Sequence, residues 1–148
     1  MDLIYLDYNC FQRGFDDTRQ LKIRMEAFAC EEIFKTAELG KINLVWSFMH
    51  ADENSFCPFF ERKIEALRLS VLCKVKIGPE DEIYNLAHNF QQKGNLSSKD
   101  AIHLACAYYA NSNYFLTCDT PFLKRAKRLN LNVTIFNPLD YIREVEIK

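Results

Sequence analysis

The chain has 148 residues, 49% of them hydrophobic, and a formal charge of −1 at pH 7. This length fits one domain of ordinary size, and the apolar content is sufficient for a buried core. The near-neutral charge excludes a protein that coats nucleic acid through bulk positive charge. Only 4 Gly and 4 Pro occur, which excludes a loop-rich or disordered chain.

The amino-terminal half alternates between short apolar runs and longer amphipathic segments. Residues 3–6 form an apolar run that stops at Asp7, as a buried strand would. Residues 20–39 have a helical apolar pattern that Gly40 ends. The pattern then predicts a second strand over residues 43–47, a helical stretch over 49–71 interrupted near Pro58, and a third strand over 73–77.

The carboxyl-terminal half continues the alternation. Pro79 is placed to open a helix at its first position, and Lys93 and Gly94 close that helix. Residues 98–110 are apolar on most sides, which predicts a helix packed between layers. Strands that alternate with helices predict an α/β fold with a parallel sheet and helices on both faces. The remaining segments are strands over 113–117 and 132–136, a short helix over 120–128, and a last helix opened by Pro138.

The six cysteines are scattered singly, without any C-x-x-C pair. This spacing disfavours a zinc ribbon or a thioredoxin-type site. Cys73 and Cys106 lie in apolar runs and are expected to be small core residues. Residues 1–7 are too short and too acidic for a secretory signal, and no stretch approaches the roughly 20 apolar residues of a membrane span. Unpaired thiols in such a chain predict a cytoplasmic location and no membrane contact.

Four acidic residues fall where a parallel sheet gathers functional groups. Ligands bind outside the carboxyl ends of the strands in open α/β sheets. Carboxylates gathered there repel one another, and a hard divalent cation such as Mg²⁺ or Mn²⁺ relieves the repulsion. Such a site supports hydrolysis of a phosphodiester bond. The four acids are Asp7 after the first strand, Glu53 on the helix after the second, Asp100 at the start of the buried helix, and Asp119 after the fourth strand.

Each acid also has a purely structural interpretation. Asp100 would complete a capping box in the segment S-S-K-D, and Asp119 would cap the helix that follows it. Asp7 would be a turn residue with Asn9 capping the next segment, and Glu53 a solvated helix residue. Their joint placement at one end of the sheet favours the metal site.

The sequence contains no strong rival to this cluster. His50, His88 and His103 have no partner at metal-ligand spacing, and no phosphate-binding glycine loop or nucleophile elbow occurs. A haloacid-dehalogenase phosphatase needs a second Asp two residues after the first, where this chain has Asn9. The chain also has a basic run, formed by Lys124, Arg125, Lys127 and Arg128. This run is either a local RNA-binding patch or a solvated helix face.

The chain resembles the PIN-domain family, including VapC-like toxin ribonucleases, over most of its length. The resemblance rests on four blocks. LIYLDYN is similar to the opening strand and places the first metal-binding Asp at Asp7, followed by the small polar Asn9. NLVWSFMHADEN is similar to the second strand, with Ser47 and then Glu53. LSSKDAIHLACA places the third acid at Asp100, and YFLTCDTPFLKRA is similar to a closing T-x-D motif at Thr117 and Asp119.

The resemblance implies a single PIN domain over residues 1–148, with a three-layer α/β/α fold and a central parallel sheet of about five strands. It implies an endoribonuclease that depends on Mg²⁺ or Mn²⁺, acts on RNA, forms a homodimer and has an antitoxin protein as partner. We expect Asp7, Asp100 and Asp119 to hold the ion and Glu53 to complete the site. Asn9 and Thr117 would orient ligands or a phosphate, and Lys99 is a candidate contact to the RNA backbone.

Some assignments stay open at the level of sequence. Asp52, Glu32 and Glu26 are alternatives to Glu53 on nearby helical segments. Tyr8 and Pro121 depart from the family pattern. Tyr8 replaces a small residue, so its ring is expected to crowd the site or to stack on a base. These departures support an alternative, a catalytically impaired PIN module that binds RNA or a protein partner. Phe11, Phe15 and Phe28 fit either a partner surface or the core.

Overall fold

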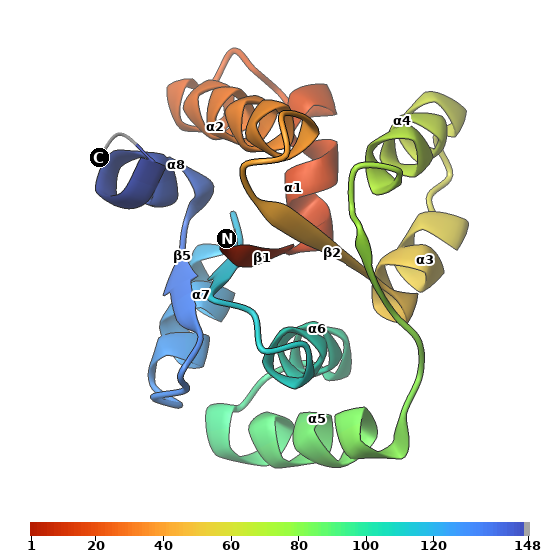
Figure 1. The fold of residues 1–148 in the computed structure, drawn as a ribbon, viewed down its shortest axis with the longest axis vertical. Coiled ribbons are helices and arrows are strands. Elements are labelled where there is room, and N and C mark those ends of the chain that lie inside the picture. The colour runs from red at the N-terminus through yellow and green to blue at the C-terminus, as the bar shows by residue number, and fades with distance from the viewer. Residues whose placement is uncertain (147–148) are drawn as a thin grey trace.

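The computed structural model describes residues 1–146 and has a five-stranded sheet at its centre, drawn as arrows in Figure 1. All neighbouring strands are parallel, in the order β3-β2-β1-β4-β5. The predicted parallel sheet is therefore confirmed, and β1 lies in its middle. The strands are β1 (Leu3–Leu6), β2 (Asn43–Ser47), β3 (Val75–Ile77), β4 (Tyr114–Leu116) and β5 (Thr134–Phe136).

Helices cover both faces of the sheet, as Figure 1 shows, and make the three-layer arrangement that the sequence predicts. One face carries α1 (Tyr8–Gln12), α2 (Leu21–Glu38), α4 (Phe60–Ser70) and α8 (Pro138–Tyr141). The other carries α5 (Asp81–Gly94), α6 (Ser98–Tyr109) and α7 (Thr120–Lys127). The remaining elements are α3 (Phe48–Ser55), a 3₁₀ turn (Arg13–Phe15) and a π-helical turn (Ile142–Glu146).

The central strand explains how one apolar run serves two cores. Successive side chains of a strand point to opposite faces of the sheet. Ile4 and Leu6 accordingly pack with α1 and α2, whereas Tyr5 packs with α5 and α6. All three side chains are fully buried. An uninterrupted apolar strand is what a parallel sheet covered on both faces requires.

The first predicted boundary of α5 is wrong. The helix begins at Asp81 and not at Pro79. Glu80 has extended backbone angles, and its carbonyl accepts the first helical hydrogen bonds, from the amides of Ile83 and Tyr84. Glu80 is thus the residue before the first turn, and Pro79 lies outside the helix. The helix ends at Gly94, and the left-handed conformation that closes it falls on Asn95, with φ of 52°.

Helix α2 buries one face and exposes apolar side chains on another. Ala29, Ile33 and Ala37 are buried against the sheet. Leu21, Met25 and Phe28, which share a face of the helix, are instead exposed, with 60%, 41% and 61% of their surface accessible. Of the three phenylalanines considered as core or partner surface, Phe11 is buried, whereas Phe15 and Phe28 are exposed.

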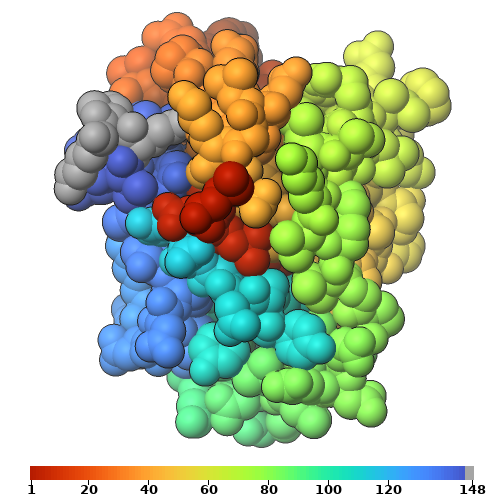
Figure 2. All heavy atoms as spheres, viewed as in Figure 1, coloured from red at the N-terminus to blue at the C-terminus, as the bar shows by residue number. Residues whose placement is uncertain are grey.

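Figure 2 shows the face of the molecule on which the chain begins. The red amino-terminal residues lie there between the orange end of α2 and the cyan segment before β4. Backbone hydrogen bonds fix this edge: the amide of Asn43 donates to Asp2 (2.9 Å), and that of Asn113 to Leu3 (2.8 Å). The amino-terminal ends of the strands therefore meet on this side, and their carboxyl ends meet on the opposite side. Among the described residues, no helix has the length and apolar character needed to cross a membrane.

Candidate metal centre

Asp7 lies at the junction of the central strand with the first helix. Its amide donates to the carbonyl of Leu116 (2.8 Å), which extends the pairing of β1 with β4 by one residue. Its side chain caps α1, because Oδ1 accepts a hydrogen bond from the amide of Tyr8 (2.8 Å). The capping residue is thus Asp7 itself, and not Asn9, as the structural interpretation of this loop would have it. Asn9 lies inside α1, a short helix that the apolar pattern did not predict.

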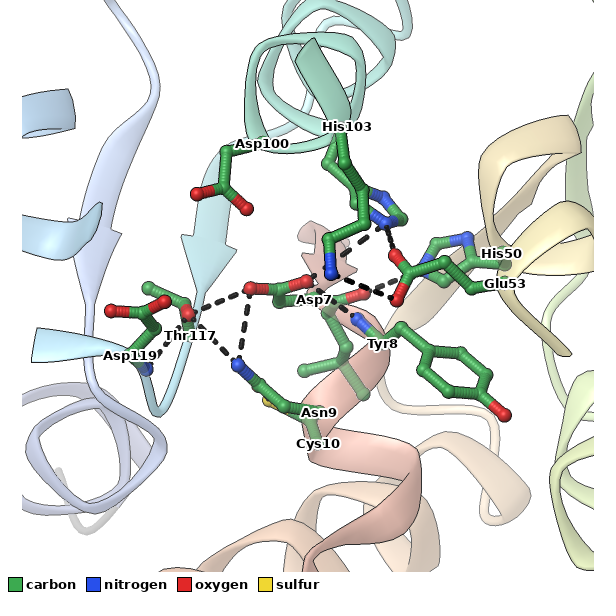
Figure 3. Close-up of polar contacts among 12 residues, drawn as sticks. Asp7, Tyr8, Asn9, Cys10, His50, Glu53, Asp100, His103, Thr117 and Asp119 are labelled. Atoms are coloured by element: carbon green, nitrogen blue, oxygen red, sulfur yellow. Dashed lines mark hydrogen bonds and ion pairs between the residues drawn. The ribbon is translucent and has the colours of Figure 1, made fainter. Parts of the chain in front are cut away.

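Two polar side chains hold the other oxygen of Asp7 in place (Figure 3). The Thr117 hydroxyl donates to Oδ2 (2.8 Å), and the Asn9 amide donates to the same oxygen (3.2 Å). Asn9 also donates to Thr117 Oγ1 (3.3 Å), and the amide of Asp119 donates to that hydroxyl oxygen (3.0 Å). Cys118 completes the link, since its amide donates to Asn9 Oδ1 (3.2 Å). The β1–α1 and β4–α7 junctions are thereby bound into one unit.

Asp100 and Asp119 approach Asp7 from two further segments. Figure 3 shows their carboxylates directed toward the same space beside Asp7. Asp119 caps α7, with Oδ1 accepting from the Phe122 amide (3.1 Å), so its capping interpretation holds alongside its position in the cluster. Ser97 caps α6 by accepting from the amide of Asp100 (3.2 Å). Only the serine half of the expected capping box is formed there.

Glu53 and His103 form the other side of the cluster. His103 lies one helical turn after Asp100, and its Nε2 is hydrogen-bonded to Glu53 Oε1. The same nitrogen is 3.9 Å from Asp7 Oδ1. Ligand atoms of Asp7, Glu53 and His103 all lie within 4.8 Å of one another. His103 has no partner at metal-ligand spacing in the sequence, but the fold brings Glu53 and Asp7 to it from distant segments. The spacing of three residues after Asp100 was the available signal, since it places both side chains on one face of a helix.

A buried chain of hydrogen bonds supports His103 from behind. Its Nδ1 is 2.6 Å from the Tyr5 hydroxyl, which is 2.7 Å from Ser47 Oγ. The amide of Ser47 donates to His50 Nδ1 (2.9 Å), so His50 Nε2 carries the proton and donates to the Leu6 carbonyl (2.6 Å). Burial lowers the pKa of His50 well below 6.5, which keeps the ring neutral as this pattern requires. All these side chains are buried, and they hold His103 in one orientation.

The environment of Asp7 and Asp100 disfavours their ionised forms. Burial raises the pKa of Asp7 to about 6, and the charges of Glu53 and Asp100 act in the same direction, against the lowering effects of His103 and Thr117. Burial also raises the pKa of Asp100, with Asp119 as the second cause. Repulsion between carboxylates is thus present at this edge of the sheet. A cation placed between them would remove it.

The three acids considered as alternatives to Glu53 for completing the metal site do not join the group around Asp7. Asp52 is exposed. Glu32 forms an ion pair with Lys35 on the surface of α2. Glu26 is buried, and its two oxygens accept hydrogen bonds from Arg13 and Asn137.

Two departures from the family pattern have structural explanations. Tyr8 is 8% exposed and donates a hydrogen bond to Asn54 (2.7 Å), and Figure 3 shows its ring directed away from Asp7. The expectation that Tyr8 crowds the site or stacks on a base is therefore wrong. Pro121 is exposed in the first turn of α7, a position where its missing amide hydrogen costs nothing.

Basic residues near the site differ in how close they come to it. Lys99 is exposed, and its ammonium group is 3.7 Å from Glu53 Oε2. The four basic residues Lys124, Arg125, Lys127 and Arg128 are also exposed. They lie toward the far end of α7, which begins at the acidic cluster and runs away from it.

Comparison with known proteins supports the fold. The chain is similar to VapBC2 from Rickettsia felis, whose structure was solved bound to a DNA fragment from its promoter. The match covers 91% of this chain and 98% of that chain, with a TM-score of 0.59 and 13% sequence identity. This similarity confirms the PIN-like fold that the resemblance to VapC-like proteins implies, and at this identity it establishes the fold alone. No protein-family model matches the chain, and no curated protein is significantly similar to it in sequence.

Proposed function

We propose that this protein is a metal-dependent endoribonuclease that hydrolyses RNA phosphodiester bonds. The observation that carries the proposal is the buried carboxylate of Asp7, which Glu53 and Asp100 approach closely enough to raise its pKa, with Asp119 acting in turn on Asp100. Oxygen donors of this kind suit Mg²⁺ or Mn²⁺, which complete their coordination with water and phosphate oxygens. When bound, such an ion supplies an activated water and stabilises charge on the phosphate.

Each side chain has a separate task in this proposal. Asp7, Asp100 and Asp119 hold the ion, directly or through water, and Glu53 completes the site. Asn9 and Thr117 fix the carboxylate of Asp7 through the hydrogen bonds already described. His103 fixes Glu53 in the same manner. Lys99 is close enough to the acids to neutralise a phosphate bound beside them.

Cleavage of labelled RNA in Mn²⁺ tests the proposal. We expect the wild-type chain to cut the RNA and Asp7→Asn and Asp100→Asn to lose at least a hundredfold in rate. Asp52→Asn is the matched control, because Asp52 is an exposed acid next to Glu53, and it should cut at the wild-type rate. Equal cleavage by all four proteins would contradict the proposal. No cleavage together with no Mn²⁺ binding by the wild type would assign the chain to the impaired alternative.

We further propose that the protein is a cytoplasmic toxin that associates with an antitoxin protein and forms a homodimer. The apolar face of α2 supports an association surface, because Leu21, Met25 and Phe28 are exposed side by side on consecutive turns. All six cysteines are free thiols, as expected in a reducing compartment.

Light scattering of the purified chain should give the mass of a dimer, and Phe28→Glu should give a monomer. Leu39→Glu, an exposed control at the end of α2, should leave the mass unchanged.

A further inference from the structure

Three cysteines that are distant in sequence meet behind the acidic cluster. Cys10 lies in α1, Cys30 lies in α2, and Cys118 lies between β4 and α7. Their sulfur atoms are all within 4.8 Å of one another. The residues are only 2%, 3% and 5% exposed. Singly scattered cysteines gave no indication of this arrangement, because only the tertiary fold brings the three segments together.

The separation of the sulfurs fits a common metal ion. A thiophilic ion binds thiolate at about 2.3 Å, which places three sulfurs roughly 4 Å apart around it. Shifts of a few tenths of an ångström would therefore close the present triangle onto an ion. Thiolates select soft closed-shell ions over Mg²⁺ or Mn²⁺, which prefer oxygen. The chemistry of this cluster is thus distinct from that of the acidic cluster.

The surroundings of the thiols include a groove and two opposite charges. Cys10 and Cys30 line a groove of about 680 Å³ that runs between α1, α2 and α4. An ion can enter through this groove without crossing the acidic cluster. Arg13 and Glu26 both lie close enough to Cys118 to act on its charge, in opposite directions. Glu26, one turn before Cys30, does not compete as a ligand, because Arg13 and Asn137 occupy its oxygens.

Packing alone does not account for the cluster equally well. Cys73 and Cys106 show what a cysteine used as a small core residue looks like, since each is buried and, among the described residues, neither belongs to a group of cysteines. Cys10, Cys30 and Cys118 instead direct three sulfurs at one another from three elements. We propose that Cys10, Cys30 and Cys118 form a binding site for one thiophilic metal ion, Zn²⁺ or Cu⁺. On binding, three S–H bonds break and three sulfur–metal bonds form, three protons pass to the solvent, and no oxidation state changes.

Occupation of this site would act on the junctions that carry the acids. Cys118 directly precedes Asp119, and its amide is hydrogen-bonded to Asn9, the neighbour of Cys10. An ion held by Cys10 and Cys118 would join the β1–α1 and β4–α7 junctions by coordination bonds in addition to their hydrogen bonds. Binding of the ion should therefore raise the melting temperature of the protein. This metal binding does not depend on the proposed ribonuclease activity.

Metal titration of the reduced full-length chain without oxygen tests the site. Zn²⁺ and Cu⁺ are offered separately, each against a coloured chelator that competes for the ion. We expect one equivalent of at least one ion to bind, with a sulfur-to-metal charge-transfer band for Cu⁺. Cys30→Ser should weaken that binding by at least a hundredfold. Cys73→Ser, a buried cysteine outside the cluster, should bind as the wild type does.

Two further measurements keep the result specific. Asp100→Asn should retain the thiol-bound equivalent, which separates this site from the acidic one. X-ray absorption of the loaded protein should show three sulfur neighbours, a readout that does not rely on any variant folding. Binding that is equal in the wild type and in folded Cys30→Ser, or an absorption spectrum with only nitrogen and oxygen neighbours, would overturn the proposal. The proposal would also be overturned if the chain bound neither Zn²⁺ nor Cu⁺.

Discussion

Asp7 is a carboxyl group placed where its ionised form is unfavourable. It is 6% exposed, and burial is the largest cause of its raised pKa. Thr117 and Asn9 partly compensate by donating hydrogen bonds to it. A carboxylate retained in such a place at neutral pH is expected to have a cationic partner in the working protein.

The raised pKa of Asp7 predicts the pH dependence of metal binding. Because the ion requires the ionised carboxylate, Mn²⁺ affinity should fall as the pH decreases below about 6. Isothermal titration at pH 5 and pH 7.5 measures this difference. An affinity that is the same at both values would show that Asp7 does not control binding.

The same group predicts how the metal-free protein responds to pH. The folded-state pKa of Asp7 lies above its ordinary value, so the folded state binds the proton more tightly than the unfolded state. The free energy of unfolding should therefore gain up to about 3 kcal/mol from Asp7 as the pH falls from 7 toward 4. Urea unfolding in the presence of a chelator measures the gain, and Asp7→Asn should lack it. A wild type and Asp7→Asn with parallel pH profiles would contradict this assignment.

His103 is the site residue that the sequence interpretation missed, and its removal should be costly. His103→Ala leaves the Tyr5 hydroxyl and Glu53 without their shared partner. Buried polar groups that lose a partner cost about 1–3 kcal/mol each, so the free energy of unfolding should fall by at least about 1 kcal/mol. Mn²⁺ affinity should fall as well, because Glu53 is no longer fixed. His88→Ala, an exposed histidine on α5, should change neither quantity.

At the scale of elements, Thr117 joins two loops that carry acids. Its hydroxyl donates to Asp7 and accepts from the amide of Asp119. Thr117→Val keeps the shape of the side chain and removes these bonds, which should lower the free energy of unfolding by about 1–3 kcal/mol. Chemical denaturation gives this value. Thr134→Val on β5 is the control, because Thr134 is exposed, and a similar loss in both variants would contradict the role of Thr117.

Gly40 ends α2 in a conformation that favours glycine. Its φ is +77°, in the left-handed region, although a Cβ there would meet no atom within 4 Å. Gly40→Ala should therefore lower the free energy of unfolding by about 1 kcal/mol through backbone strain alone. Gly14→Ala also enters open space but carries no positive φ, so thermal unfolding should show no comparable loss. Equal effects of the two substitutions would rule out strain as the cause.

The elements were largely predictable because their patterns are local. The apolar run ending at Asp7 and the alternation of strands with helices indicate the sheet directly. The partners of His103 and the meeting of the three cysteines were not predictable, because both depend on which segments the fold brings together. The exposed face of α2 was also hidden, since an apolar pattern does not state whether the core or a partner covers it.

The whole molecule places its acids through the order of its strands. β1 is central, β4 and β2 are its neighbours, and Asp7, Asp119 and Glu53 follow these three strands. The carboxyl ends of parallel strands meet at one edge, so the acids converge without any contact between them in sequence.

Diffraction from crystals soaked in Mn²⁺ tests the central claim most directly, because the anomalous signal locates the ion without any assay. We predict a peak between Asp7, Asp100, Asp119 and Glu53, with carboxylate oxygens at about 2.0–2.3 Å. The peak should vanish in Asp7→Asn crystals and persist in Asp52→Asn crystals. Soaked crystals in which these carboxylates have no peak between them would contradict the account.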